Sequence, residues 1–189
     1  CFIQASNWYV GNYHNDIARG FAKTILKVLL DSYDKLTDNP EDERARGNIM
    51  WASCVNAMGV FHSGLDEFYA WTLYSVGYIP RVWHNVSYRE ALVVAYPNWL
   101  KGISKYHMED IKLFFTEIFG IDSILDDKTI IEIGCSQIKQ MMKNSGVTDN
   151  LSEYGECPSK EYIVRELSQE DFGEFTVDEM HEMVAACYL

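Results

Sequence analysis

The chain has 189 residues, of which 48% are hydrophobic and 14% aromatic, and its formal net charge is −12. These values are typical of a globular domain with an apolar core, and we expect one domain over residues 1–189. The acidic charge disfavours nucleic acids and anionic membrane surfaces as partners, because both attract basic patches. No apolar run reaches the length of about eighteen residues that a membrane span requires.

The first third of the chain has helical periodicity. Apolar residues recur at three- and four-residue steps and predict a helix over about 15–36. Pro40 is typical of a first helical turn, with Asp38 or Asn39 as the cap, so we expect the next helix to begin there.

The middle of the chain gives mixed signals. A helix over about 65–77 carries Trp71 and Tyr74, and we expect the segment from Gly77 to Pro80 to interrupt it. The following run over 91–96 favours a strand by propensity alone.

The last third of the chain is again helical. The pattern predicts amphipathic helices over 109–119, closed by Gly120, and over 129–144. Thr176 and Glu179 form a capping box before a final helix. Because period-two alternation is nowhere sustained, the sequence predicts an all-α bundle of seven to nine helices.

The five cysteines are an odd number with wide spacing and no C-x-x-C pair. Cys54 and Cys135 fall in apolar helical patterns, so we expect buried thiols and a cytoplasmic location. An N-terminal Cys1 is also compatible with a mature lipoprotein, but the residues after it are typical of a packed helix and not of a polar linker.

One histidine offers a candidate metal site. His84 lies four residues before Tyr88, and on a helix the two side chains would share a face. With Glu90 they could hold a metal ion; the alternative is that His84 is a surface or structural residue. The sequence has no Gly-rich dinucleotide fingerprint, nucleophile elbow or phosphate loop.

Two neighbouring segments carry a more specific signal. They read Trp71-Thr-Leu-Tyr-Ser-Val-Gly-Tyr78 and Tyr88-Arg-Glu-Ala-Leu-Val-Val-Ala-Tyr-Pro97. They resemble the strip W-x-x-H-x-x-G-H-E-L-(x)-H-(x)-L-A-I-V-x-P-x-x-W of iron-containing alcohol dehydrogenases, closest to the NADPH-dependent butanol dehydrogenase branch. Five non-histidine positions of this strip, which we call its frame, are matched by Trp71, Gly77, Leu92, Pro97 and Trp99. Similar matches cover residues 15–30, 39–52 and 146–155, so the resemblance extends over nearly the whole chain.

The resemblance implies a ligand set that this chain has replaced. Tyr74 and Tyr88 occupy the positions of two metal-binding histidines, and Tyr78 occupies the catalytic histidine position beside the substrate. Gln4 stands at a further ligand position, and the family's aspartate ligand would precede Cys1. The tyrosines could fill the space left by the imidazoles, bind a metal ion as phenolates, or, for Tyr78, donate a proton.

The resemblance also implies a fold and a function class. The fold would be the dehydroquinate synthase-like, all-α C-terminal domain of the family, with no counterpart here of the N-terminal nucleotide-binding domain. The family uses Fe or Zn and NAD(P), but we expect no cofactor in this chain and no activity of the chain alone. Alternatives are a non-catalytic interaction or oligomerisation domain, or a rebuilt tyrosine-ligated metal site.

The partner expected from the resemblance is a nucleotide-binding domain or a second copy of the chain. We expect apolar surface around Phe2, Trp8 and the strip Trp71–Tyr78 to be exposed for that partner.

Overall fold

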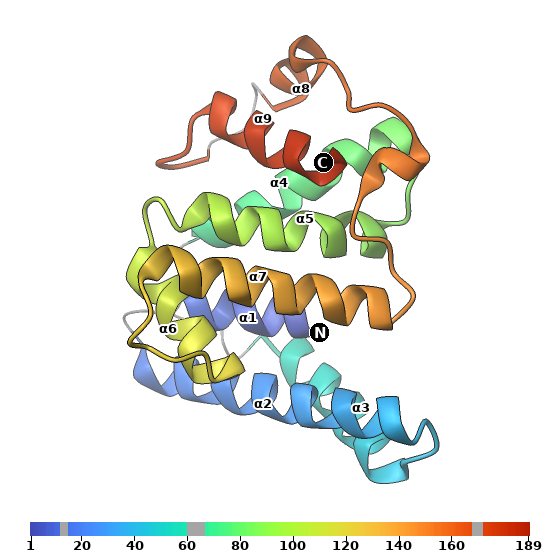
Figure 1. Cartoon of the computed structure of the whole chain (residues 1–189), viewed down its shortest axis with the longest axis vertical. Helices are drawn as coiled ribbons and strands as arrows, with labels where there is room; N and C mark the ends of the chain where they lie inside the picture. The colour runs from blue at the N-terminus through green and yellow to red at the C-terminus, as the bar shows by residue number, and fades with distance from the viewer. Residues whose placement is uncertain (12–14, 60–66, 168–171) are drawn as a thin grey trace. The chain divides into compact units, whose positions relative to one another are not determined.

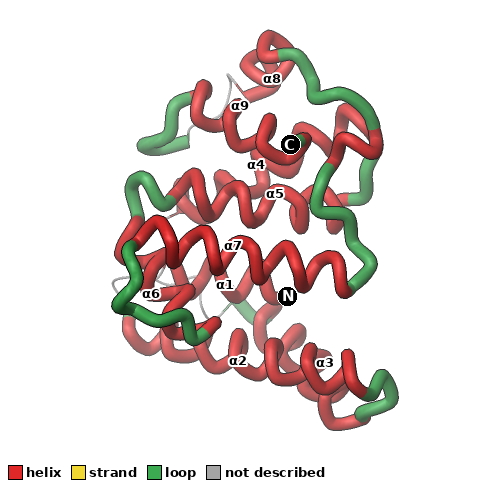
Figure 2. Tube along the Cα trace, in the orientation of Figure 1, coloured by secondary structure: helices red, strands yellow, loops and turns green. Residues whose placement is uncertain are grey.

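The computed structural model describes residues 1–11, 15–59, 67–167 and 172–189, with the backbone alone for 67–71. Throughout these ranges every regular element is helical, with nine α-helices, two short 3₁₀ helices and no strand (Figure 1, Figure 2). The all-α prediction is therefore confirmed. Within the same ranges no helix is long and apolar enough to cross a bilayer.

The helices in chain order are α1 (Phe2–Gly11), α2 (Asp16–Asp38), α3 (Glu43–Ala57), α4 (Glu67–His84), α5 (Tyr88–Ile103), α6 (Met108–Phe119), α7 (Asp127–Asn144), η2 (Leu151–Tyr154), α8 (Lys160–Leu167), α9 (Val177–Ala185) and η3 (Ala186–Tyr188). They belong to two compact units. The first unit is Cys1–Asp66 with Glu117–Gly120, and the second is Glu67–Thr116 with Ile121–Leu189.

In the first unit, α2 packs against both α1 and α3. Helix α1 carries apolar residues on all sides and is buried along most of its length, which is typical of a core helix. Trp8 is only 3% exposed, and half-buried Phe2 lies edge-on to Phe119 with 6.1 Å between ring centroids. The prediction of an exposed apolar patch at Phe2 and Trp8 was therefore wrong.

The starts of α2 and α3 are set by polar caps. The side chain of Asn15 accepts a hydrogen bond from the Ala18 N–H at 3.0 Å. Helix α3 begins after Asp42, whose carboxylate accepts from the Ala45 N–H at 2.9 Å, and not at Pro40 as predicted. A carboxylate cap satisfies an otherwise unpaired helical N–H, which Pro40 in the preceding turn cannot do.

In the second unit, α4 continues through Gly77 and Pro80 without the predicted interruption. A Cβ on Gly77 would lie 2.9 Å from Cδ2 of Leu92, so α4 and α5 approach closely at this glycine. Ile79 and Pro80 are also buried. Packing of α4 against α5 thus outweighs the cost of an interior proline, which is about 3 kcal/mol.

Helix α5 is the centre of the second unit and contacts α4, α7 and α9 (Figure 1). Its β-favouring run adopts helix, as the family resemblance implied, because burial on several sides overrides local propensity. Two glycines allow close neighbours. A Cβ on Gly102 would lie 2.3 Å from the Met183 methyl, and one on Gly134 in α7 would lie 2.1 Å from the Phe115 ring.

Two predicted helix ends are confirmed. Helix α6 ends at Phe119, and Gly120 takes φ = 70°, which favours glycine. The capping box of α9 is complete, since Thr176 and Glu179 each accept from the other's backbone N–H.

The two cysteines predicted to be buried differ. Cys135 is buried, but Cys54 on α3 is exposed, so the prediction for Cys54 was wrong. Helix α3 carries apolar residues on two opposite faces, and periodicity alone could not say which face the rest of the chain covers.

Candidate functional site

The retained family residues hold α4 against α5. The Trp99 indole N–H, which is fully buried, donates a hydrogen bond to the Thr72 hydroxyl at 2.8 Å. Gly77 and Leu92 form the close contact described above. The side chain of Trp71 lies outside the described residues. The spacing read from the sequence is thus that of a packing frame, which fixes two helices relative to each other.

The three tyrosines lie on this frame but not in its interior. Tyr74 and Tyr78 are one turn apart on α4, and Tyr88 is the first residue of α5. Tyr74 is half-buried, whereas Tyr78 is 43% and Tyr88 49% exposed. The Arg81 guanidinium lies over the Tyr88 ring, 5.6 Å from its centroid.

The fourth predicted position, Gln4, belongs to the first unit. Its side-chain oxygen accepts a hydrogen bond from the Asn56 amide at 3.0 Å, and the same amide donates to the Cys1 carbonyl at 3.3 Å. Asn56 is buried, so this pair of neutral amides ties α1 to α3. The structure gives Gln4 a structural partner.

The tyrosine hydroxyls and the Gln4 amide are poor ligands for a divalent metal ion. A phenol ionises near pH 10, so forming a phenolate at pH 7 costs about 4 kcal/mol before a metal returns any energy. Exposure of Tyr78 and Tyr88 gives water access to their hydroxyls, and the Arg81 cation beside Tyr88 would repel a metal ion there. In the described part of the chain, His, Cys, Asp and Glu form no group of three that could hold a metal ion.

The alternative site built on His84 does not have the predicted geometry. His84 ends α4 and Tyr88 begins α5, so the two do not share a helical face. The His84 ring packs on Tyr188, with 5.6 Å between centroids. Glu90 instead accepts hydrogen bonds from the Tyr154 hydroxyl at 2.7 Å and the Ser87 hydroxyl at 2.9 Å, and these bonds lower its pKa.

A polar cluster that the sequence did not predict joins the turn after α5 to α9. Glu179 accepts from the Thr176 N–H at 2.9 Å, the Tyr106 hydroxyl at 3.0 Å and the Lys105 ammonium at 3.3 Å. Its pKa is lowered to about 2, first by the Thr176 backbone hydrogen bond. The capping box was readable in the sequence, but the tertiary partners of Glu179 were not.

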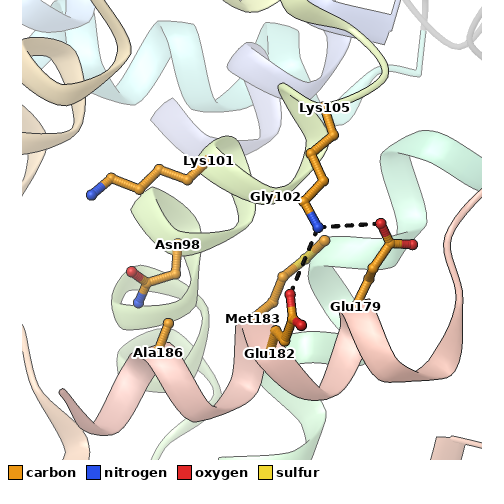
Figure 3. Close-up of a pocket in the computed structure, with 8 residues that line it drawn as sticks. All are labelled: Asn98, Lys101, Gly102, Lys105, Glu179, Glu182, Met183 and Ala186. Carbon is orange, nitrogen blue, oxygen red and sulfur yellow. Dashed lines mark hydrogen bonds and ion pairs between the residues drawn. The ribbon is translucent and has the colours of Figure 1, made fainter. Parts of the chain in front are cut away.

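The cluster borders a shallow pocket of about 210 Å³ between α5 and α9 (Figure 3). Its lining residues are Asn98, Lys101, Gly102, Lys105, Glu179, Glu182, Met183 and Ala186. Lys105 reaches both Glu179 and Glu182, at 3.3 and 3.7 Å, while Lys101 points away from them in Figure 3. The charges in this pocket largely neutralise each other, and its lining contains no nucleophile paired with a base.

The described residues form an all-α chain, and the Gly, Leu, Pro and Trp positions of the resemblance lie on its α4–α5 pair. The family model for the Fe-containing alcohol dehydrogenase family, C-terminal, matches residues 1–187. The chain belongs to the iron-containing alcohol dehydrogenase family.

Curated relatives are distant and longer. NADH-dependent butanol dehydrogenase A of Clostridium acetobutylicum is 24% identical over 138 residues, which are 72% of this chain and 35% of the relative. NADPH-dependent aldehyde reductase YqhD of Escherichia coli is 22% identical over 135 residues, or 71% of this chain and 34% of the relative.

Solved structures share the fold. The substrate- and cofactor-free form of aldehyde reductase YqhD from E. coli superposes with a TM-score of 0.85 at 20% identity, covering 98% of this chain and 50% of that chain. NADH-dependent butanol dehydrogenase A from Thermotoga maritima gives a TM-score of 0.76 at 16% identity, covering 100% and 51%. The chain thus spans about half the length of these solved relatives.

Proposed function

We propose that this chain is the C-terminal helical domain of an NAD(P)-dependent alcohol or aldehyde oxidoreductase lineage in which the metal ligands have been replaced. The lineage reaction is hydride transfer between NAD(P)H and a carbonyl group that a bound metal polarises. In this proposal the chain by itself does not transfer hydride.

The donor set carries the proposal. Tyr74 and Tyr88 stand at the family's metal-binding histidine positions, Tyr78 at the catalytic position and Gln4 at a further ligand position. Neutral imidazole binds first-row metals near neutral pH, whereas a phenol must first lose its proton and an amide offers only a weak oxygen donor. The exposure of Tyr78 and Tyr88 and the Arg81 cation support the same conclusion.

Nucleotide binding is the second part of the proposal. The relatives are named for NADH or NADPH dependence, and this chain spans only about half of the solved ones. We infer that any nucleotide site of the assembled protein lies in a domain outside residues 1–189, supplied by the same or another chain. A cytoplasmic location is part of the same proposal.

Activity of the chain is the first test. NADH and NADPH oxidation with butyraldehyde is followed at 340 nm, with and without added iron or zinc. The expected rate equals that of the no-enzyme control, and the butanol dehydrogenase relative serves as the positive control. Metal-dependent oxidation above the blank would refute the inactive assignment.

Metal content tests the donor argument separately. Elemental analysis of untagged protein is expected to give less than one equivalent of iron or zinc. One equivalent of iron, with a visible phenolate-to-iron charge-transfer band that disappears in Tyr88→Phe, would instead support the rebuilt tyrosine-ligated site. Tyr154→Phe is the matched control, because Tyr154 is similarly exposed at 42% but stands outside the family ligand positions.

The second candidate function is that of an interaction or oligomerisation domain. The observation that favours it is a set of large apolar side chains on α3 that are exposed in the described part of the chain: Met50, Trp51 and Met58. Such a surface is usually the site of a partner.

A further inference from the structure

The Arg81 guanidinium lies beside two positions of the tyrosine strip. Arg81 follows Tyr78 by three residues on α4, so the two side chains are neighbours on one face of that helix. Across the turn to α5, the same guanidinium lies over the Tyr88 ring, 5.6 Å from its centroid. A fixed cation of the chain therefore stands beside the positions that the resemblance gives to a metal ligand and to the catalytic histidine.

Arg81 keeps its capacity to donate hydrogen bonds to a ligand. Stacking on Tyr88 uses the flat face of the guanidinium and leaves the N–H groups at its edge accessible. Arg89, the residue after Tyr88, is also exposed. In the part of the chain that the structure describes, neither arginine is paired with a carboxylate.

Two arginines without a carboxylate are unusual in so acidic a chain. Asp and Glu outnumber Lys and Arg by 28 to 16, so most basic side chains could find an acidic neighbour. The carboxylate nearest to Arg89 in sequence, Glu90, is already engaged. It accepts hydrogen bonds from the Tyr154 hydroxyl at 2.7 Å and the Ser87 hydroxyl at 2.9 Å. The start of α5 therefore retains positive charge that an anionic ligand can neutralise.

The exposed rings define the rest of the ligand. Tyr78 is 43% and Tyr88 49% exposed, so both present apolar ring surface to solvent. Aromatic rings pack well against other planar groups, and a guanidinium binds a carboxylate through two parallel N–H···O bonds. The arrangement fits a carboxylate that is attached to a planar apolar body.

The net charge of the chain selects a ligand with a single negative charge. At −12, the chain repels anions at long range, and the repulsion grows with the charge of the ligand. A dianionic phosphate ester or an acidic peptide pays more of this repulsion than a monocarboxylate does. The local positive charge of two arginines is sufficient to pair with one carboxylate.

We propose that Tyr78, Arg81, Tyr88 and Arg89, which we call the Arg81 cluster, bind a small monocarboxylate with a planar apolar body. Arg81 holds the carboxylate, Arg89 adds positive charge, and the two rings contact the apolar body. Because the chain supplies the cation itself, binding requires no metal ion. This inference rests on the proposed replacement of the metal ligands.

Benzoate is the probe, and isothermal titration calorimetry of the EDTA-treated full chain measures its binding. Saturable binding at one site is expected, and Arg81→Gln should weaken it roughly tenfold or more. Arg44→Gln is the matched control, because Arg44 on α3 is also exposed and has no paired carboxylate in the described ranges. Circular dichroism of both variants checks that helicity is retained. Equal affinity of Arg81→Gln and the unmodified chain would overturn the proposal.

Tyr88 separates the arginine site from a site that holds a metal ion. Tyr88→Phe keeps the ring and should bind benzoate as the unmodified chain does, whereas Tyr88→Ala should bind it more weakly. A metal ion held by the Tyr88 phenolate would instead make binding sensitive to both EDTA and Tyr88→Phe, which would overturn this inference and the proposed function together. Absence of both metal and benzoate binding would overturn this inference alone.

Three further probes test the ligand class. Benzyl alcohol has the ring without the charge and should not bind measurably. Phenyl phosphate has a second negative charge, and a hexaglutamate peptide offers carboxylates without a planar body, so both should bind more weakly than benzoate. Tighter binding of phenyl phosphate or of the peptide would overturn the monocarboxylate assignment, and binding of benzyl alcohol as tight as that of benzoate would overturn the role of Arg81.

Discussion

At the residue scale, the glycines at close helix contacts matter because they leave space for a neighbouring side chain. This role is more important there than their conformational freedom. Gly134 sits in the interior of α7, and a Cβ there would lie 2.1 Å from the Phe115 ring, which is fully buried. The ring cannot move without displacing its own neighbours. This steric conflict is larger than the helix-propensity gain of up to about 1 kcal/mol that alanine offers.

Gly134→Ala is therefore expected to lower the free energy of unfolding by about 1–3 kcal/mol. Gly20→Ala in α2 is the matched control, because nothing lies within 4 Å of a Cβ at that position. It should raise the free energy of unfolding by about 0.5–1 kcal/mol. Urea denaturation measures both; equal effects of the two substitutions would contradict the contact.

Glu179 makes a pH-dependent contribution to stability. Its pKa falls from 4.5 to about 2 in the folded chain, mainly through the Thr176 backbone hydrogen bond. A carboxyl group whose pKa is depressed by folding stabilises the folded state above its unfolded pKa. That contribution is lost as the pH falls from about 4.5 toward 2.

The expected result is a steeper loss of stability between pH 5 and pH 3 in the unmodified chain than in Glu179→Gln. Other carboxylates also titrate here, so the readout is the difference between the two chains, measured by urea denaturation at each pH. Glu109→Gln, at an exposed glutamate outside the cluster, is the matched control for the loss of one carboxylate. Parallel curves for the unmodified chain and Glu179→Gln would refute the assignment.

At the element scale, the α4–α5 pair depends on one buried polar contact as well as on apolar packing. The hydrogen bond from Trp99 to Thr72 is 2.8 Å long, and Thr72 is 2% exposed. Removing the acceptor leaves a buried indole N–H without that bond, and burying an unsatisfied donor costs about 1–3 kcal/mol.

Thr72→Val should therefore destabilise the chain by about 1–3 kcal/mol with little change in volume. In a double-mutant cycle with Trp99→Phe, the two effects should be less than additive by about 1 kcal/mol. Thermal or chemical unfolding of the four chains gives the coupling energy. Full additivity would mean that the contact contributes no pairwise energy.

The same pair of helices explains an incorrect boundary prediction. Gly77 and Pro80 read as a break because local propensity disfavours both residues in a helix. In the structure the Gly77–Leu92 contact and the buried Ile79 favour a continuous α4. Tertiary burial outweighed local helix propensity, and a short stretch of sequence does not show which residues will be buried.

At the scale of the whole molecule, the five thiols divide by accessibility. Cys1 and Cys54 are exposed, Cys157 is half-buried, and Cys135 and Cys187 are buried. Burial raises the pKa of both Cys135 and Cys187 to about 12, so neither forms much thiolate near neutral pH.

Dilute native protein at pH 8 should show two rapidly labelled cysteines with a thiol reagent, a slower third, and all five only after unfolding. Cys54→Ser should remove one of the two fast reactions. Rapid labelling of Cys135 or Cys187 in the native protein would contradict the packing around α5.

The sequence alone was sufficient for the family, the all-α class and several helix ends. Those features depend on helical periodicity, on Gly120, and on the Thr176 and Glu179 capping box, all of which act over a few residues. The assignment of Tyr74, Tyr78, Tyr88 and Gln4 to the family's ligand and catalytic positions, which came from the resemblance, remains a prediction. The extent of a single domain over residues 1–189 likewise remains a prediction.

Only the tertiary structure decided which apolar faces are covered. Trp8 is buried although the family resemblance had suggested that it is exposed for a partner. Cys54 is exposed although its apolar helical pattern predicted burial, because periodicity identifies an apolar face but not the helix that packs on it. The same reason applies to Glu179, whose capping role is local but whose partners Tyr106 and Lys105 come from a distant segment. Contacts between segments far apart in the chain depend on how helices pack, and that packing is the information a local pattern lacks.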